Sequence, residues 1–121
     1  MRKILVVDDE EDVLQILEKR LNSSGYQVIT AKNGREAIEK ASRELPNLIL
    51  LDIFLPDIDG GEVAQQLREN ETTKDIPVIF LSCLFTKEDE KRGGHLRGGN
   101  FFVAKPFEFN ELLDIINRSV S

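Results

Sequence analysis

Short runs of consecutive apolar residues alternate along the chain with longer segments in which apolar and polar residues are mixed. Runs such as KILVV and PVIFL, with β-branched residues and no polar interruption, are typical of strands buried on both faces of a sheet. The pattern therefore predicts five strands, at residues 3–7, 26–31, 48–51, 77–81 and 100–104.

The mixed segments carry apolar residues three and four positions apart, as at Leu14, Leu17 and Leu21. This spacing places them on one side of a helix. The first predicted helix opens at 10–12 and stops at 22–25, and the others cover 35–43, 61–70, 86–96 and about 108–119. Gly93 and Gly94 weaken the fourth helix, by roughly 1 kcal/mol each relative to Ala.

Strands that alternate with helices, and that are apolar throughout, predict an α/β fold with a parallel sheet covered by helices on both faces. The chain has 121 residues, which is the size of one domain, and we expect a single domain over residues 1–121. Asp52 stands directly after the apolar run LILL, so it should lie at the carboxyl end of the third strand.

Composition narrows the classes of function. The net charge of −6 and the pI near 4.8 argue against direct nucleic-acid binding by this domain. No apolar run reaches membrane-spanning length, and the start MRKILVVDDE does not have the pattern of a signal peptide. Cys83 is the only cysteine and has no internal partner, which favours a reducing cytoplasmic location.

The polar residues of chemical interest follow the predicted strands. Asp8 and Asp9 follow the first strand, Asp52 the third, Ser82 the fourth and Lys105 the fifth. The carboxyl ends of parallel strands share one edge of the sheet, where open α/β folds bind ligands. Residues distant in sequence are therefore expected to converge there.

Carboxylates gathered at one edge repel one another unless a cation is present. Ligands that are all oxygen suit a hard cation, and Mg²⁺ binds through one or two carboxylates together with waters and phosphate oxygens. Lys105 adds a positive charge and Ser82 a hydroxyl donor. Such a site fits phosphoryl transfer to Asp52.

Four segments, in this order and spacing, resemble the receiver (CheY-like) domain of two-component response regulators: LVVDDE, LLDIFLPDIDG, PVIFLS and FFVAKPF. The resemblance covers essentially the whole chain. It implies a flavodoxin-like (βα)5 three-layer sandwich whose five-stranded parallel sheet has the order 2-1-3-4-5. It also implies a phosphorylation-activated signalling switch. Such a domain catalyses its own aspartyl phosphorylation and dephosphorylation, and it is not an enzyme that turns over a separate substrate.

The resemblance further implies that Asp52 accepts a phosphoryl group from a phosphohistidine on a sensor histidine kinase or a phosphotransfer protein. Asp9 and Asp52 would bind Mg²⁺ directly, and Asp8 mainly through water. The backbone carbonyl of Phe54 would be another metal ligand. Ser82 and Lys105 would contact the phosphoryl oxygens, Pro106 would follow a cis peptide, and Phe102 would be the switch aromatic.

The face formed by residues 86–96, 100–104 and 108–119 would change its affinity for a downstream output domain or effector protein, and a homodimer could form through its two helices. The chain departs from the commonest family pattern in three places. Cys83 follows Ser82 where a small residue is usual, Phe102 lacks a phenol hydroxyl, and glycine pairs dilute the fourth helix. These departures bear on the choice of partner more than on the phosphorylation site.

Phe54 and Leu84 lie two residues beyond Asp52 and Ser82 and flank the predicted site. Both are large and apolar, so they should hinder the water that attacks a phosphoaspartate and offer it no hydrogen bond. We expect slow self-dephosphorylation.

The sequence alone leaves other interpretations of one motif and of the function open. The segment Asp57-Ile-Asp59-Gly60 resembles the haloacid dehalogenase phosphatase motif, although Leu55 and Pro56 separate it from the strand. It does not match the spacing of an EF-hand calcium loop, and a simple turn into the third helix accounts for it better. A Mg²⁺-dependent phosphatase and a receiver-like binding module that is never phosphorylated are the two functional alternatives.

Overall fold

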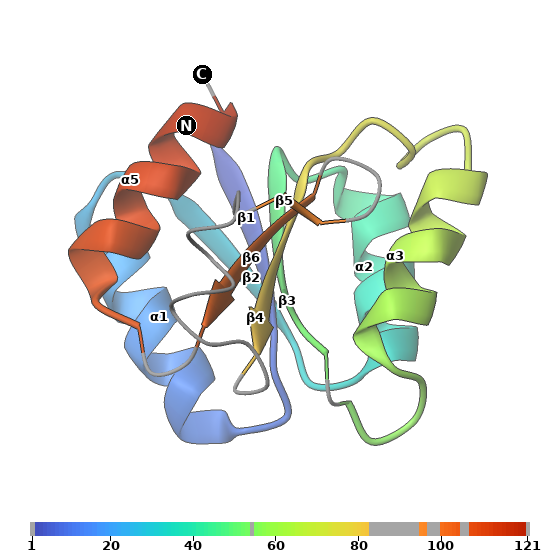
Figure 1. Cartoon of the computed structure of the whole chain (residues 1–121), viewed down its shortest axis with the longest axis horizontal. Helices are drawn as coiled ribbons and strands as arrows, with labels where there is room; N and C mark the ends of the chain where they lie inside the picture. The colour runs from blue at the N-terminus through green and yellow to red at the C-terminus, as the bar shows by residue number, and fades with distance from the viewer. Residues whose placement is uncertain (1, 54, 83–94, 97–99, 105–106, 121) are drawn as a thin grey trace.

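The computed structural model describes residues 2–53, 55–82, 95–96, 100–104 and 107–120. Strands and helices alternate along most of the chain (Figure 1). In order they are β1 (Lys3–Val7), α1 (Glu11–Ser23), β2 (Gln27–Ala31), α2 (Gly34–Glu44), β3 (Leu48–Asp52), α3 (Gly60–Glu69), β4 (Val78–Ser82), β5 (His95–Leu96), β6 (Asn100–Ala104) and α5 (Phe109–Val120).

The strands form one sheet in the order β2-β1-β3-β4-β6-β5. The pairs from β2 to β6 are all parallel, and β6 is the fifth strand expected from the sequence. The flavodoxin-like order 2-1-3-4-5 is therefore confirmed, with one short antiparallel strand added at its edge.

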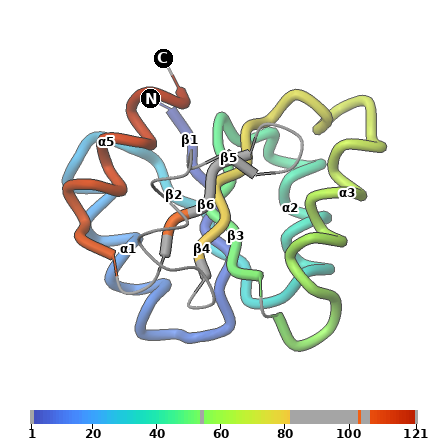
Figure 2. The backbone as a smooth tube through the Cα atoms, in the orientation of Figure 1, coloured from blue at the N-terminus to red at the C-terminus, as the bar shows by residue number. Residues whose placement is uncertain are grey.

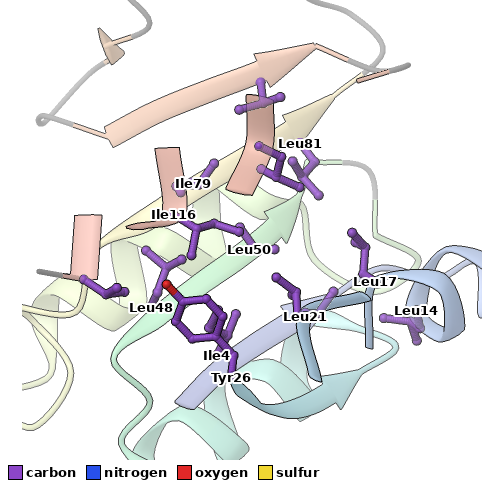
Figure 3. Packing of buried hydrophobic residues seen from close by; sticks show 14 residues of the cluster. Ile4, Leu14, Leu17, Leu21, Tyr26, Leu48, Leu50, Ile79, Leu81 and Ile116 are labelled. Carbon is purple, nitrogen blue, oxygen red and sulfur yellow. The ribbon is translucent and has the colours of Figure 1, made fainter. Parts of the chain in front are cut away.

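Helices cover both faces of the sheet. In Figures 1 and 2, α1 and α5 lie on one side of the strands and α2 and α3 on the other. Successive residues of β3 face the two sides in turn: Leu48 and Leu50 pack with α1 and α5, while Ile49 and Leu51 pack with α2 and α3. Figure 3 shows the first of these cores, in which the leucines of α1 approach β1 and β3. The apolar runs of β1, β3 and β4 are therefore buried on both faces of the sheet, as predicted.

The predicted helix at 86–96 is wrong at its carboxyl end, because His95–Leu96 forms strand β5. β5 pairs antiparallel with β6, with Leu96 opposite Asn100. Gly93-Gly94 and Gly98-Gly99 flank His95–Leu96, and glycine disfavours a helix. Residues 86–94 of that predicted helix lie outside the described residues.

The helix ends follow from local chemistry. Asn33 accepts a hydrogen bond from the Glu36 backbone N–H at 2.8 Å and caps α2, and Asp59 caps α3 in the same way from Glu62 at 2.9 Å. After α1 the chain turns through Gly25 at φ 95°, a conformation that glycine adopts without strain. Over the described ranges, the helices are too short or too polar to cross a membrane.

Candidate functional site

The register of the sheet brings the predicted acids to one edge. The last pair between β1 and β3 joins Val7 to Leu51, and these two residues are followed by Asp8 and Asp52. Asp52 in turn pairs with Leu81 of β4, one residue before Ser82. The backbone therefore places Asp8, Asp52 and Ser82 at the carboxyl ends of neighbouring parallel strands, as the sequence predicted.

Two of these acids are withdrawn from solvent. Asp8 is fully buried, and Asp52 keeps 6% of its surface exposed. The Asp8 backbone N–H donates to the Ala31 carbonyl at 3.1 Å, and an oxygen of its carboxylate accepts from the Glu10 backbone N–H at 2.9 Å. These bonds fix Asp8 at the start of α1. Burial of a carboxylate is unfavourable unless charges or hydrogen bonds compensate, so this edge is built for polar partners.

A group of acids capable of holding a metal follows β1, the strand that pairs with β3. Asp8, Asp9 and Glu10 each offer a carboxylate oxygen, and these oxygens lie within 4.8 Å of one another. Asp9 and Glu10 are exposed, so the group opens to solvent. An all-oxygen donor set of this kind fits Mg²⁺. Asp8 and Asp9 were predicted from the sequence as metal ligands, whereas Glu10 was predicted only to open a helix. The run of consecutive acids after β1 was the signal that could have identified Glu10.

The loop from β3 to α3 is closed tightly beside Asp52. The Gly60 backbone N–H donates to the Ile53 carbonyl at 2.7 Å. A Cβ atom at Gly60 would lie 2.5 Å from the Asp52 carbonyl oxygen and 2.8 Å from the Ile53 Cα atom. Only glycine therefore permits α3 to start this close to the end of β3.

Asp57 in this loop makes a contact that the sequence analysis did not predict. Its two carboxylate oxygens accept hydrogen bonds from the backbone N–H groups of Gly34 and Arg35 at 2.8 and 2.9 Å. Desolvation raises the pKa of Asp57, but the hydrogen bonds from Arg35, Gly34 and the loop backbone outweigh it and lower the pKa to about 2. Asp57 thus binds the amino end of α2, while Asp59 and Gly60 begin α3. The segment 57–60, which resembles a phosphatase motif, is therefore a turn into α3, as predicted.

Several predicted site residues lie outside the described residues. These are Phe54, Cys83, Leu84, Lys105 and Pro106. Ser82 and Phe102 are described in their backbone, where Ser82 pairs with Ala104 and Phe102 pairs with Phe80. Lys105 directly follows the pair of Ser82 and Ala104 in sequence. Its expected role remains a prediction.

Comparison with known proteins gives consistent results. Residues 4–117 match the family described as response regulator receiver domain. The chain is 43% identical over 111 residues to the alkaline phosphatase synthesis transcriptional regulatory protein PhoP of Bacillus subtilis. That match covers 92% of this chain and 45% of PhoP, so the chain spans about half the length of the curated relatives it matches.

Solved structures agree in fold over the whole chain. The response regulator protein TrrA of Thermotoga maritima, in complex with Mg²⁺–BeF, is 34% identical with a TM-score of 0.81, covering 98% of this chain and 99% of that one. The receiver domain of a Pseudomonas aeruginosa sensor histidine kinase, with a magnesium ion in its active site cleft, is 30% identical with a TM-score of 0.85, covering 98% and 97%.

Proposed function

This chain belongs to the response regulator receiver domain family of two-component systems, and from that premise we propose that it is a signalling switch controlled by phosphorylation of Asp52. The observation that carries the proposal is the position of Asp52. It is a nearly buried carboxylate at the carboxyl end of the central strand β3, next in register to Asp8 and to the acidic group Asp8, Asp9 and Glu10.

In the proposed reaction, a carboxylate oxygen of Asp52 attacks the phosphorus of a phosphohistidine on a sensor histidine kinase or phosphotransfer protein. The new P–O bond forms as the P–N bond breaks, and the imidazole leaves and takes up a proton from solvent. Transfer of this kind depends on positioning and on stabilising charge over the phosphoryl oxygens. The burial of Asp52 limits the directions from which the donor can approach.

The acidic group fits Mg²⁺, which would neutralise charge on the phosphoryl oxygens and bring them to Asp52. Asp9 and Asp52 would hold the ion directly, Asp8 through water, and the backbone carbonyl of Phe54 would complete the protein ligands. Magnesium in the two similar structures supports this assignment. Ser82 and Lys105, at the ends of the next two parallel strands, would bind the phosphoryl oxygens.

Phosphorylation would then bias a two-state element. Ser82 would move toward the phosphoryl group and Phe102 would follow into the space it leaves. These residues occupy β4 and β6, and β6 leads into α5. The surface that includes β6 and α5 would thereby change its affinity for an output domain or effector protein, or for a second copy of this chain. Relatives described as transcriptional regulators support an output of that general kind.

Incubation with acetyl phosphate and Mg²⁺, followed by intact mass measurement, tests the proposal. We expect one added phosphoryl group on the wild-type chain, and none on Asp52→Ala or after chelation of Mg²⁺. Release of phosphate without an adduct would indicate a phosphatase. The absence of both adduct and turnover would indicate a binding module, and either result would overturn the switch.

A further inference from the structure

We propose that Asp57 is a positioning residue, whose carboxylate anchors the loop that follows Asp52 to the amino end of α2. The inference rests on the proposed function, because its consequence for activity requires that this loop help to form the phosphorylation site. It assigns a role to a residue outside the acidic group, whose carboxylate is bound to the amino end of α2.

The anchor satisfies two donors that the helix itself leaves without acceptors. The first four N–H groups of a helix have no partner within it. In α2, Asn33 supplies a side-chain acceptor for Glu36, and its backbone carbonyl accepts from Ala37 at 3.1 Å. The N–H groups of Gly34 and Arg35 are bound by Asp57, which lies 23 and 22 residues further along the chain. The amino end of α2 is therefore completed by the β3–α3 loop.

The loop is also seated on α2 by packing. A Cβ atom at Gly34 would lie 2.4 Å from Cγ1 of Ile58 and 2.8 Å from Cγ2 of Val63. The missing side chain of Gly34 makes the room that Ile58 occupies, directly beside the Asp57 carboxylate in sequence. Hydrogen bonds and packing thus fix the same point of the loop against α2.

The other end of the loop is fixed to the phosphoacceptor strand. The Gly60 N–H binds the Ile53 carbonyl at 2.7 Å, and Asp59 caps α3. The chain between Ile53 and Gly60 is therefore held at its base and at Asp57. The anchor therefore restricts the described part of the loop that follows Asp52, which is itself a proposed metal ligand. Support for a metal ligand by its surroundings commonly changes affinity by about 10- to 100-fold.

The test compares Asp57→Ala with Asn33→Ala in the full chain. Both variants remove an acceptor from the amino end of α2, but only Asp57→Ala releases the loop. Mg²⁺ alone is titrated into the unphosphorylated proteins and followed by amide NMR shifts. Exchange of the Gly60 amide hydrogen is measured without Mg²⁺, and a circular dichroism melt confirms that each variant is folded.

We expect Asp57→Ala to weaken Mg²⁺ binding by about tenfold, the lower end of effects on supporting groups around a metal. Exchange of the Gly60 amide should accelerate by roughly tenfold or more, as local opening becomes easier. Asn33→Ala should leave both quantities near wild type. Asp57→Asn keeps one carbonyl acceptor and should be intermediate, and it decides the question if Asp57→Ala does not fold.

If Asp57→Ala and Asn33→Ala changed Mg²⁺ affinity and Gly60 exchange equally, fraying of α2 would account for both changes. That result would overturn the proposed anchor. Unchanged Gly60 exchange in Asp57→Ala would overturn it as well. A wild-type protein that binds no Mg²⁺ would refute the proposed metal centre, while the Gly60 exchange would still decide whether Asp57 holds the loop. The two proposals can therefore fail separately.

Discussion

The neighbouring glycines at the start of α3 offer a sharp test of how Asp52 is positioned. Gly60→Ala places a Cβ atom 2.5 Å from the Asp52 carbonyl oxygen and 2.8 Å from the Ile53 Cα atom. Both are backbone atoms at the end of β3 and cannot rotate away as a side chain can. Among the described residues, Gly61→Ala meets only the Asp59 carboxylate oxygen, at 3.1 Å, at the tip of a side chain. The two substitutions are chemically identical and differ in what they touch.

The expected magnitude follows from these distances. To reach ordinary contact, α3 and the backbone of Asp52 and Ile53 must separate by about 0.6–0.9 Å. Overpacking of this kind costs ~1–3 kcal/mol. The separation also strains the 2.7 Å hydrogen bond from Gly60 to Ile53, for which ~1 kcal/mol is a typical net contribution. The higher helix propensity of alanine offsets at most ~1 kcal/mol. Gly60→Ala should therefore lower the free energy of unfolding by about 1–3 kcal/mol.

Urea denaturation followed by circular dichroism measures this difference directly. Gly61→Ala should be neutral, or more stable by up to ~1 kcal/mol, because alanine favours the helix and restricts the unfolded chain. Gly60→Ala should also react more slowly with acetyl phosphate, since the Asp52 backbone has moved. If the two variants agree within ~0.5 kcal/mol, the usual range for neutral surface changes, the close approach of α3 to Asp52 does not exist in solution.

Three further predictions concern the core, the pH dependence and the phosphorylated lifetime. Leu17 is 1% exposed, and Leu17→Ala should lower the free energy of unfolding, measured by urea denaturation, by ~2–5 kcal/mol. Ile16 is 58% exposed, and Ile16→Ala should change the same quantity by no more than ~0.5 kcal/mol. Equal losses in the two variants would contradict the packing of α1. Because the pKa of Asp57 is lowered from 3.8 to about 2 in the folded protein, its ionised form stabilises the fold above pH 3.8 and this contribution is lost as the pH falls toward 2. The stability advantage of wild type over Asp57→Asn in urea should shrink across that window, and an advantage that grows with acidity would refute the assignment. Phe54→Asn combined with Leu84→Glu should shorten the lifetime of the phosphorylated protein, because water would then reach the phosphoaspartate more easily. The lifetime is measured by loss of the adduct mass after the phosphoryl donor is removed. An unchanged decay rate would show that these side chains do not shield the phosphoaspartate from water.

The parallel fold could be predicted because the strands are apolar on both faces. In β3, Leu48 and Leu50 face one pair of helices while Ile49 and Leu51 face the other, so polar residues are excluded from both sides. Asp52 ends the run and was placed correctly by that fact alone. The convergence of Asp8 and Asp52 then followed from parallel pairing.

Features that depend on contacts between distant segments could not be predicted in this way. Asp57 was interpreted as part of a turn. Its carboxylate accepts hydrogen bonds from backbone N–H groups of α2, and backbone groups leave no pattern in the sequence that would reveal such a contact. Strand β5 was assigned to a helix, because two residues are too few for a periodic pattern. The glycines around it indicated a weak helix, but not the antiparallel pairing with β6.

Transfer of the phosphoryl group to Asp52 is tested by locating the residue that becomes phosphorylated. The chain is phosphorylated with acetyl phosphate and Mg²⁺, reduced with borohydride to convert the acyl phosphate into a stable alcohol, and analysed by peptide mass mapping. We expect one modified position, at residue 52, and no modification when Mg²⁺ is chelated. Modification at Asp8, Asp9 or Asp57 in place of Asp52, or modification independent of Mg²⁺, would contradict it.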